Sequence, residues 1–193
     1  PQLWQSPDHP LWLLLDRQQL PVDFIQEEDV EAGLPAHYRA VFALGDCLTR
    51  QASAKLVEWV HAGGQLWLCP GAGLYDEYRR DNPAMTGLTG FRADALRVNK
   101  QFGNWGSLLG TPQPLTTVQP KDAAVPALPA LFARQDFVTP GEVLATFADG
   151  KPALAKTPAG QGQVWQAGFM LGLAYGAGCN KQANDGYATV FPE

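Results

Sequence analysis

The sequence is poor in cysteine and in charged residues. Its three cysteines include no Cys-x-x-Cys pair, so neither a disulfide framework nor a zinc site is predicted. Charged residues make up 17% of the chain and the formal net charge is −5, which leaves no basic surface for nucleic acid or anionic lipid. The longest apolar run, residues 11–15, is too short to span a bilayer. We therefore expect a soluble chain with no nucleic-acid or membrane partner and no cofactor.

The start of the chain and its shifts in composition bear on domain organisation. The chain begins at Pro1 rather than at a methionine, as expected for a piece of a longer polypeptide, and no compartment is indicated. Its 193 residues suit one hydrophobic core better than two. We expect a single domain over residues 1–193, with βα units at 1–90, a loop-rich insertion at 91–140, an antiparallel meander at 141–175 and a tail without assigned structure at 176–193.

Strand and helix signals alternate in the first of these parts. Helical spacing predicts helices at 11–20 and 50–62, the second capped by Thr49. Apolar runs predict three short strands, at residues 22–25, 38–44 and 66–69. This alternation favours a parallel sheet, whose ligands bind at the carboxyl ends of the strands.

Turn signals return near the end of the chain. Asp-Gly at 149–150 and Gly-Gln-Gly at 160–162 separate apolar runs, which is typical of hairpins. We therefore expect antiparallel strands that extend the sheet or form a second layer.

Cys69 stands where the nucleophile elbow of an α/β enzyme would place its reactive side chain, between a predicted strand and a glycine-rich turn. Such an elbow usually has glycine two residues before the nucleophile and holds an oxyanion with the backbone N–H just after it. Here Trp67 takes the first position, and Pro70 has no N–H. The nearest histidine in sequence, His61, ends the preceding helix. We favour a structural role for Cys69, with catalysis as the weaker alternative.

Polar residues follow two of the predicted strands. Asp46 comes directly after the strand at 38–44, and Asp76, Glu77 and Tyr78 lie in the loop after the next strand. Both loops are expected at the same edge of the sheet, where Asp46 and Asp76 would share a polar pocket. Adjacent carboxylates rarely supply the two opposed groups of a glycosidase, so a hydrogen-bonded loop or a subunit contact is the preferred interpretation.

Glycines and aromatic residues complete the candidate sites. Gly71 and Gly73 could cradle a phosphate, but the Gly-x-Gly pattern lacks the third glycine of a dinucleotide site and the Lys-Ser/Thr of a P-loop. Four aromatic residues of the proline-rich middle are candidates for an interface, although they could equally anchor long loops to the core. They are Phe102, Trp105, Phe132 and Phe137.

Five short segments occur in a familiar order. They are Pro-Val-Asp-Phe at 21–24, Gly-Gly at 63–64, Gly-Ala-Gly-Leu-Tyr-Asp-Glu-Tyr at 71–78, Gly-Lys-Pro-Ala at 150–153 and Gly-Gln-Gly-Gln-Val at 160–164. On this series the chain resembles the trimerisation domain of family 42 β-galactosidases, in the class I glutamine amidotransferase-like superfamily. The resemblance implies a flavodoxin-like α/β three-layer sandwich with a parallel sheet and C-terminal antiparallel strands.

The resemblance implies assembly rather than catalysis. In that family the domain follows a catalytic barrel that carries the glycosidase carboxylates, so the expected partner is an upstream catalytic domain or further copies of the chain, with carbohydrate as another candidate. Two alternatives remain open: an amidotransferase-like hydrolase that uses Cys69, and a carbohydrate-binding module.

The chain departs from the family pattern in two places. The family's domain opens with an apolar strand before its first helix, whereas only Gln2-Leu3-Trp4 precedes Ser6 here. Amidotransferases of the superfamily draw a histidine from downstream of their cysteine, whereas no histidine follows Cys69. The first departure puts the completeness of the sheet in doubt, and the second argues against catalysis.

Overall fold

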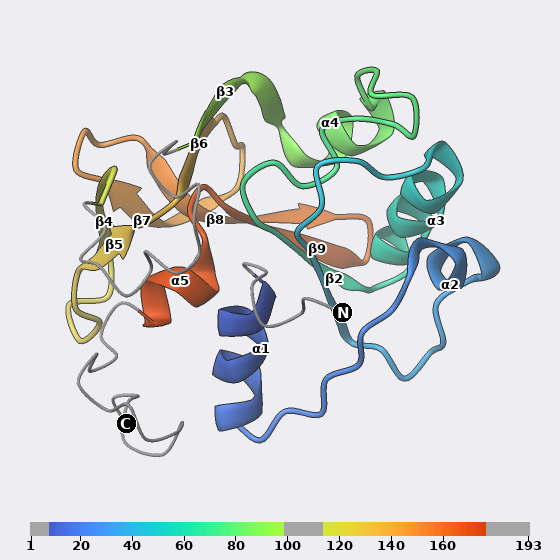
Figure 1. Cartoon of the computed structure of the whole chain (residues 1–193), viewed down its shortest axis with the longest axis horizontal. Coiled ribbons are helices and arrows are strands. Elements are labelled where there is room, and N and C mark those ends of the chain that lie inside the picture. Colours follow the sequence, from blue (N-terminus) through green and yellow to red (C-terminus); the bar gives the residue numbers. More distant parts are fainter. Residues whose placement is uncertain (1–7, 99–113, 177–193) are drawn as a thin grey trace.

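The computed structural model describes residues 8–98 and 114–176, which form an α/β fold around one large mixed sheet (Figure 1). Five helices and nine strands are assigned within these ranges. The helices are α1 (Asp8–Arg17), α2 (Glu27–Ala32), α3 (Arg50–His61), α4 (Pro83–Thr89) and α5 (Leu171–Gly176). The strands are β1 (Ala40–Ala43), β2 (Gln65–Leu68), β3 (Phe91–Val98), β4 (Thr116–Pro120), β5 (Leu128–Ala130), β6 (Ala133–Phe137), β7 (Glu142–Phe147), β8 (Pro152–Ala159) and β9 (Gly162–Ala167).

The large sheet is parallel at one edge and antiparallel elsewhere. Its seven strands run in the order β1-β2-β9-β8-β7-β4-β5, and β3 pairs with β6 in a small antiparallel sheet. The pairs β1 with β2 and β2 with β9 are parallel, whereas β9 with β8 and all later pairs are antiparallel. The predicted meander is therefore present, and its last strand also completes the parallel edge.

Helix α3 has a capped amino end and an apolar face that packs on the sheet. The hydroxyl of Thr49 accepts a hydrogen bond from the N–H of Ala52 at 3.0 Å, as the sequence predicts for an N-cap. Ala52, Leu56 and Val60 recur at helical spacing and are buried against the sheet with Leu66 of β2. Helices α2 and α4 pack on either side of α3, whereas α1 and α5 pack together elsewhere on the sheet (Figure 1).

Several sequence-based expectations are wrong. The strand expected at 22–25 is absent, and this stretch has no regular structure. The loop-rich insertion at 91–140 contains β3, β4, β5 and β6, and α4 lies in a stretch that carried no helix prediction. Residues 171–176, where the expected meander meets the expected tail, form the helix α5. Strands form only where they find a pairing neighbour, and local patterns do not report which distant residues supply one.

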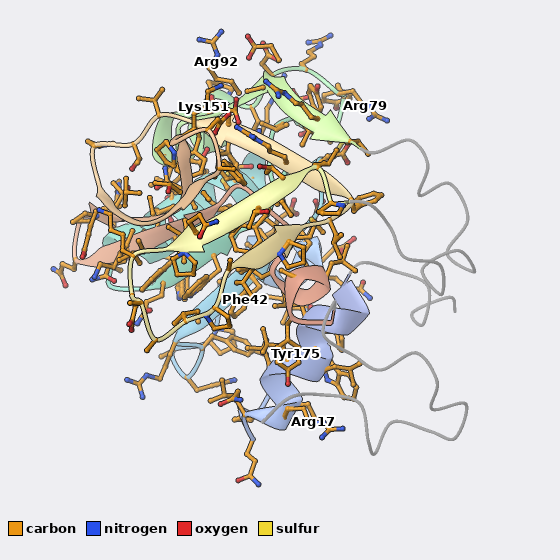
Figure 2. The ribbon with its side chains drawn as sticks, turned by 90° about the vertical axis from the view of Figure 1, so that its left-hand side faces the viewer. Arg17, Phe42, Arg79, Arg92, Lys151 and Tyr175 are labelled. Carbon is orange, nitrogen blue, oxygen red and sulfur yellow. The ribbon has the colours of Figure 1, made fainter. Side chains whose placement is uncertain are left out.

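Side chains of the two ends of the molecule can be located in Figure 2. Figure 2 shows Arg79, Arg92 and Lys151 at one end of the molecule, Arg17 and Tyr175 at the other, and Phe42 between them. No helix within residues 8–98 and 114–176 combines the length and apolar character needed to cross a bilayer.

Candidate functional site

Cys69 lies directly after β2, as the sequence predicts, but its surroundings are apolar. The residue is 1% exposed and belongs to a buried cluster with Leu131, Ala133, Met170 and Leu173. Its backbone N–H donates to the carbonyl of Ala43, which continues the parallel pairing of β1 with β2. Burial of this kind withholds a thiol from substrate.

The turn after Cys69 has no free backbone donor at the place where an elbow would hold an oxyanion. Pro70 has no N–H, and the N–H of Gly71 donates to Oε1 of Gln135 at 2.7 Å. Gln135 is fully buried and also donates from Nε2 to the carbonyl of Arg92 at 3.1 Å. The glycines considered as a possible phosphate cradle lie in a tight turn, in which Gly71 and Gly73 have φ angles of 90° and 64°.

The histidines of the described residues lie at the amino ends of the parallel strands, opposite to Cys69. His37 precedes β1, and the backbone of His61 lies against Gly160, in the turn just before β9. Because β1, β2 and β9 are parallel, these positions are at the amino ends of the strands, whereas Cys69 is at a carboxyl end. The side chain of His9 is outside the described set. The described residues thus bring no histidine to Cys69 as a base.

The burial of Cys69 predicts a slow reaction with alkylating agents. In the native protein we expect iodoacetamide to modify Cys69 at least about 100-fold more slowly than in the urea-unfolded chain, because modification requires local opening. Half-buried Cys47 provides an internal comparison. Mass spectrometry of tryptic peptides over a time course would measure both rates, and rapid, selective alkylation of native Cys69 would restore the enzyme hypothesis.

The polar loops after β1 and β2 lie side by side, as predicted. The N–H of Tyr75 donates to the carbonyl of Asp46 at 2.9 Å, and the N–H of Leu48 donates to the carbonyl of Tyr75 at 2.9 Å. Each predicted carboxylate is paired with an arginine: Asp46 with Arg79 at 3.1 Å and Asp76 with Arg50 at 2.6 Å. The two loops are thus held together by backbone hydrogen bonds, and both of their predicted carboxylates are ion-paired.

Asp76 is the most constrained member of this set. Its side chain is 1% exposed and accepts hydrogen bonds from the guanidinium of Arg50 and from the backbone N–H groups of Tyr78 and Arg80. Burial alone would raise the pKa of Asp76, but these hydrogen bonds outweigh it and hold the pKa below its ordinary value. A carboxylate with all these donors around it organises a loop and is poorly suited to act as an acid or a nucleophile.

The other predicted site residues have varied surroundings. Glu77 accepts a hydrogen bond from the backbone N–H of Arg50 at 2.9 Å, at the start of α3. Tyr78 is 67% exposed, with the guanidinium groups of Arg50 and Arg80 each 5.8 Å from its ring centre. Trp105 and Phe102 lie outside the described residues. Phe137 is 6% exposed and packs edge-on against Phe91, so it is a core residue rather than an interface candidate. Within residues 8–98 and 114–176, no group of three or more His, Cys, Asp or Glu side chains could hold a metal ion.

A row of aromatic side chains crosses the sheet on the face opposite α3. Phe42, Trp67 and Trp165 occupy register positions on β1, β2 and β9, and each is half-buried. Trp67 and Trp165 stack with ring centres 4.3 Å apart and an interplanar angle of 4°, and Phe42 stacks on Trp67 at 5.4 Å. The aromatic row, as we name these three residues, was missed in the sequence because Trp67 and Trp165 are about a hundred residues apart and meet only through parallel pairing.

Charged residues flank the aromatic row beyond Trp165, on strands β8 and β7. On β8, Nζ of Lys156 lies 5.5 Å from the ring centre of Trp165 and 3.1 Å from the carboxylate of Glu142 on β7. Nε1 of Trp165 is buried and has no hydrogen-bond partner among the described residues. Each ring face of Trp67 is covered by a neighbouring ring, and Trp165 lies between Trp67 and Lys156, so these tryptophans have no open face on which a sugar could stack.

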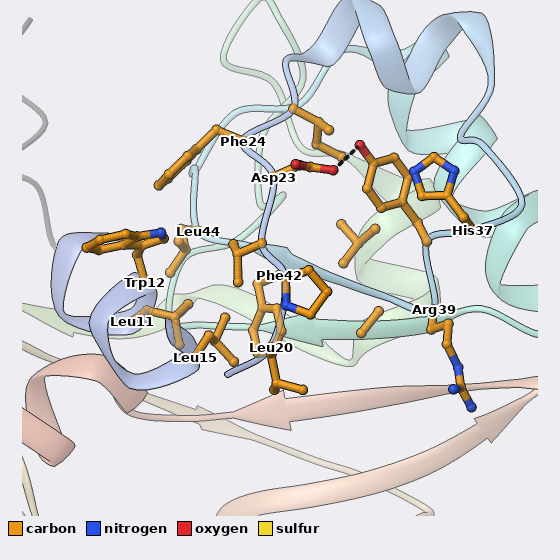
Figure 3. Close-up of a pocket in the computed structure, with 16 residues that line it drawn as sticks. Leu11, Trp12, Leu15, Leu20, Asp23, Phe24, His37, Arg39, Phe42 and Leu44 are labelled. Atoms are coloured by element: carbon orange, nitrogen blue, oxygen red, sulfur yellow. Dashed lines mark hydrogen bonds between the residues drawn. The ribbon is translucent and has the colours of Figure 1, made fainter. Parts of the chain in front are cut away.

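A groove of about 510 Å³ adjoins the aromatic row at β1 (Figure 3). Its walls are α1, residues 20–25 and residues 37–44, and most of the lining side chains are apolar. Phe42 belongs to both the groove and the aromatic row. At the rim, Leu20 is 52% exposed and Phe24 is 65% exposed. The apolar surface therefore continues from the sheet face around its β1 edge.

The sequence matches no family model and no curated protein, but the fold matches solved structures. A catalytic mutant of Gan42B, a GH42 β-galactosidase from G. stearothermophilus, aligns with 84% of this chain at 17% identity and a TM-score of 0.64. The cold-adapted β-galactosidase from Rahnella sp. R3 aligns with 83% of this chain at 18% identity and a TM-score of 0.64. The cytoplasmic protein STM3548 from Salmonella typhimurium aligns with 82% of this chain at 13% identity and a TM-score of 0.57.

The extent of these alignments differs between the two kinds of protein. The chain covers 22% and 24% of the two β-galactosidase chains, but 73% of the Salmonella protein. At these identities the likeness concerns the fold alone. The fold of this chain is that of a region occupying about a quarter of GH42 β-galactosidases, and it also occurs in a small protein.

Proposed function

We propose that this chain is a non-catalytic accessory domain of a β-galactosidase-like protein, and that it mediates assembly with other copies of itself or with a catalytic barrel. The aromatic row is the observation that carries the proposal. Three half-buried aromatic rings in register on one sheet face offer the large, rigid apolar area that is enriched at protein interfaces. The likeness to a region of GH42 β-galactosidases supports the choice of parent protein.

The proposal includes the finer description of the fold. We infer that the domain is a variant of the flavodoxin-like three-layer sandwich. In support, β1, β2 and β9 are parallel and α3 packs on one face of this part of the sheet. The additional antiparallel strands β8, β7, β4 and β5 extend the sheet beyond the parallel edge.

The catalytic alternative has less support. Cys69 is buried, and the N–H of Gly71 already donates to Gln135. The described histidines, His37 and His61, lie at the amino ends of the parallel strands, away from Cys69. These observations favour a scaffold over a hydrolase.

Self-association provides the test. We expect the apparent mass in sedimentation equilibrium to rise with protein concentration, and the Trp67→Ala variant to weaken association at least about 10-fold, because loss of a central aromatic anchor typically costs more than 1 kcal/mol of binding energy. Circular dichroism would establish that this variant remains folded.

A control variant sharpens this test. Tyr78→Ala alters an exposed aromatic residue of the loop after β2 and should leave association unchanged. Equal weakening by Trp67→Ala and Tyr78→Ala, or a folded Trp67→Ala variant that associates like the wild type, would contradict the proposal.

A further inference from the structure

The turn between β7 and β8 contains the dipeptide Asp149-Gly150. In an Asp-Gly sequence the backbone nitrogen of the glycine can attack Cγ of the aspartate, because glycine has no Cβ to hinder the approach. The new C–N bond closes a five-membered succinimide, and one carboxyl oxygen leaves as water. Water then opens the ring at either carbonyl carbon and gives aspartate or isoaspartate. One water molecule is lost and one is regained, so the reaction needs no other reagent.

The hairpin engages the nitrogen that would attack. The N–H of Gly150 donates to the carbonyl of Phe147 at 2.8 Å, and the N–H of Phe147 donates to the carbonyl of Lys151 at 2.8 Å. The φ angle of Gly150 is 83°, a backbone conformation that favours glycine. Ring closure removes the proton from the nitrogen of Gly150 and therefore breaks its hydrogen bond to Phe147. The reaction thus requires local opening of the turn.

The hairpin also engages the carboxyl group that would be attacked. Oδ2 of Asp149 accepts a hydrogen bond from the guanidinium of Arg134 at 2.6 Å, and Oδ1 accepts one from the N–H of Lys151 at 3.3 Å. An oxygen that leaves as water must come from a protonated carboxyl group. The hydrogen bond from Arg134 is the main cause of a lowered pKa at Asp149, so it keeps this carboxyl group ionised and poorly reactive.

Arg134 is itself held in place on β6. Its side chain is 7% exposed, its guanidinium carbon lies 4.1 Å from the ring centre of Phe147, and it also pairs with Asp136 at 2.8 Å. The side chain of Asp149 is 45% exposed and Gly150 is exposed, so water reaches the turn. A buried, fixed cation therefore holds a solvent-accessible carboxylate of a reactive dipeptide.

We propose that Asp149 is a site of spontaneous isomerisation to isoaspartate, and that its ion pair with Arg134 keeps it unreactive while the chain is folded. Isomerisation adds one carbon atom to the main chain of the turn and moves the carboxylate onto Cα. Arg134 then loses one of its two partners, and since Arg134 belongs to β6, the change extends to the contact between the small sheet and the large one. The inference does not involve the aromatic row and is independent of the proposed assembly.

The rate of isoaspartate formation in the native and the urea-unfolded chain tests the proposal. Both samples are incubated for several weeks at neutral pH and digested, and chromatography with electron-transfer fragmentation assigns and quantifies isoaspartate. We expect Asp149 to isomerise at least about 10-fold more slowly in the native chain, because the reaction requires opening of the turn. The other Asp-Gly dipeptide of the sequence, at 185–186, lies outside the described residues and should match Asp149 in urea. Equal rates for Asp149 in the native and unfolded chain would overturn the proposal.

Substitution of arginines in the same charged cluster tests the role of Arg134. In Arg134→Met, kept well below its Tm, we expect Asp149 to isomerise at least about 3-fold faster than in the wild type, because the carboxyl group loses its main partner. Arg97→Met is the matched control for charge. Among the described residues Arg97 pairs with Asp136 at 3.6 Å and not with Asp149, so this variant should react at the wild-type rate.

A second control separates the ion pair from a general loss of stability. In Gly162→Ala an added Cβ would clash with the backbone of Val60 and Gly64, far from the β7–β8 turn, so this variant should be less stable yet isomerise at the wild-type rate. If circular dichroism shows that Arg134→Met is unfolded, Arg134→Gln, which keeps a donor without the charge, takes its place. A folded Arg134 variant with the wild-type rate, or equal acceleration in Arg97→Met or Gly162→Ala, would overturn the proposal.

Discussion

Replacement of Gly162 by alanine is expected to lower the free energy of unfolding by about 3 kcal/mol or more and the Tm by about 10 °C, the upper range for overpacking in a domain of this size. Gly162 begins β9 and lies next to the backbone at the end of α3 and of the turn that follows it. A Cβ atom there would lie far inside van der Waals contact with the carbonyl oxygens of Val60 and Gly64, and 3.0 Å from the N–H nitrogen of Gly64. These are backbone atoms, which cannot move without breaking the hydrogen bond from Gln163 N to Gly64 O.

Gly87→Ala is the matched control for this prediction. Gly87 is an exposed residue of α4, and a Cβ added there would meet no atom within 4 Å. Alanine has the higher helix propensity, so this variant should gain up to about 1 kcal/mol. Differential scanning calorimetry of the two variants measures both effects. Equal Tm values for Gly162→Ala and wild type would show that the α3 and β9 backbones are not in close contact.

Replacement of Arg134 by methionine is expected to cost about 3 kcal/mol, or about 6–12 °C in Tm, because it leaves carboxylates at a partly buried site without their main partner. The guanidinium of Arg134 is 7% exposed, lies 4.1 Å from the ring centre of Phe147, and pairs with Asp136 at 2.8 Å and Asp149 at 2.6 Å. Arg134 thus connects β6 of the small sheet to the β7–β8 turn of the large one. Arg134→Lys keeps the charge without the planar fork and should lose less.

The effect of Arg134→Met should depend on pH in a defined direction. Burial alone would raise the pKa of Asp136, but hydrogen bonds from Lys151 and Arg134 outweigh it and lower the pKa; for Asp149 the hydrogen bond from Arg134 is the main cause of a lowered pKa. A carboxyl group with a lowered pKa stabilises the folded state above its unfolded value, near 3.8, and loses this contribution as the pH falls through the folded value. The difference in Tm between wild type and Arg134→Met should therefore be full at pH 7 and should shrink below about pH 4. A difference that grows on acidification would contradict this assignment.

Elements with strong local signals were predicted from the sequence. Helix α3 was predicted because Thr49, an amphipathic run and Gly63-Gly64 all agree, and the β7–β8 hairpin was predicted from Asp149-Gly150. The strand at 22–25 failed because β propensity does not make a strand without a neighbour. The small sheet was missed because β3 and β6 pair across a long separation in sequence.

The candidate site, too, was predicted from the sequence only in part. Two features could be predicted from the sequence. Pro70 lacks an N–H in any fold. The loops after two neighbouring parallel strands meet at the same end of the sheet, as those of Asp46 and Asp76 do. The partners of these groups were not readable, because Gln135 and Arg50 reach them through the fold. The aromatic row and the groove depend on strand register, which a single sequence does not specify.

The position of β9 in the sheet has a consequence for the kinetics of folding. β2 ends at Leu68, yet its neighbour β9 begins at Gly162, so the parallel edge is completed only by a strand near the end of the described chain. At a synthesis rate of about 5–20 residues per second, β2 emerges roughly 5–20 s before its partner. During this interval its outer edge is open to pairing with other nascent chains. Closing the long loop between β2 and β9 should therefore limit the folding rate, and nascent chains released before β9 is synthesised should be prone to aggregation.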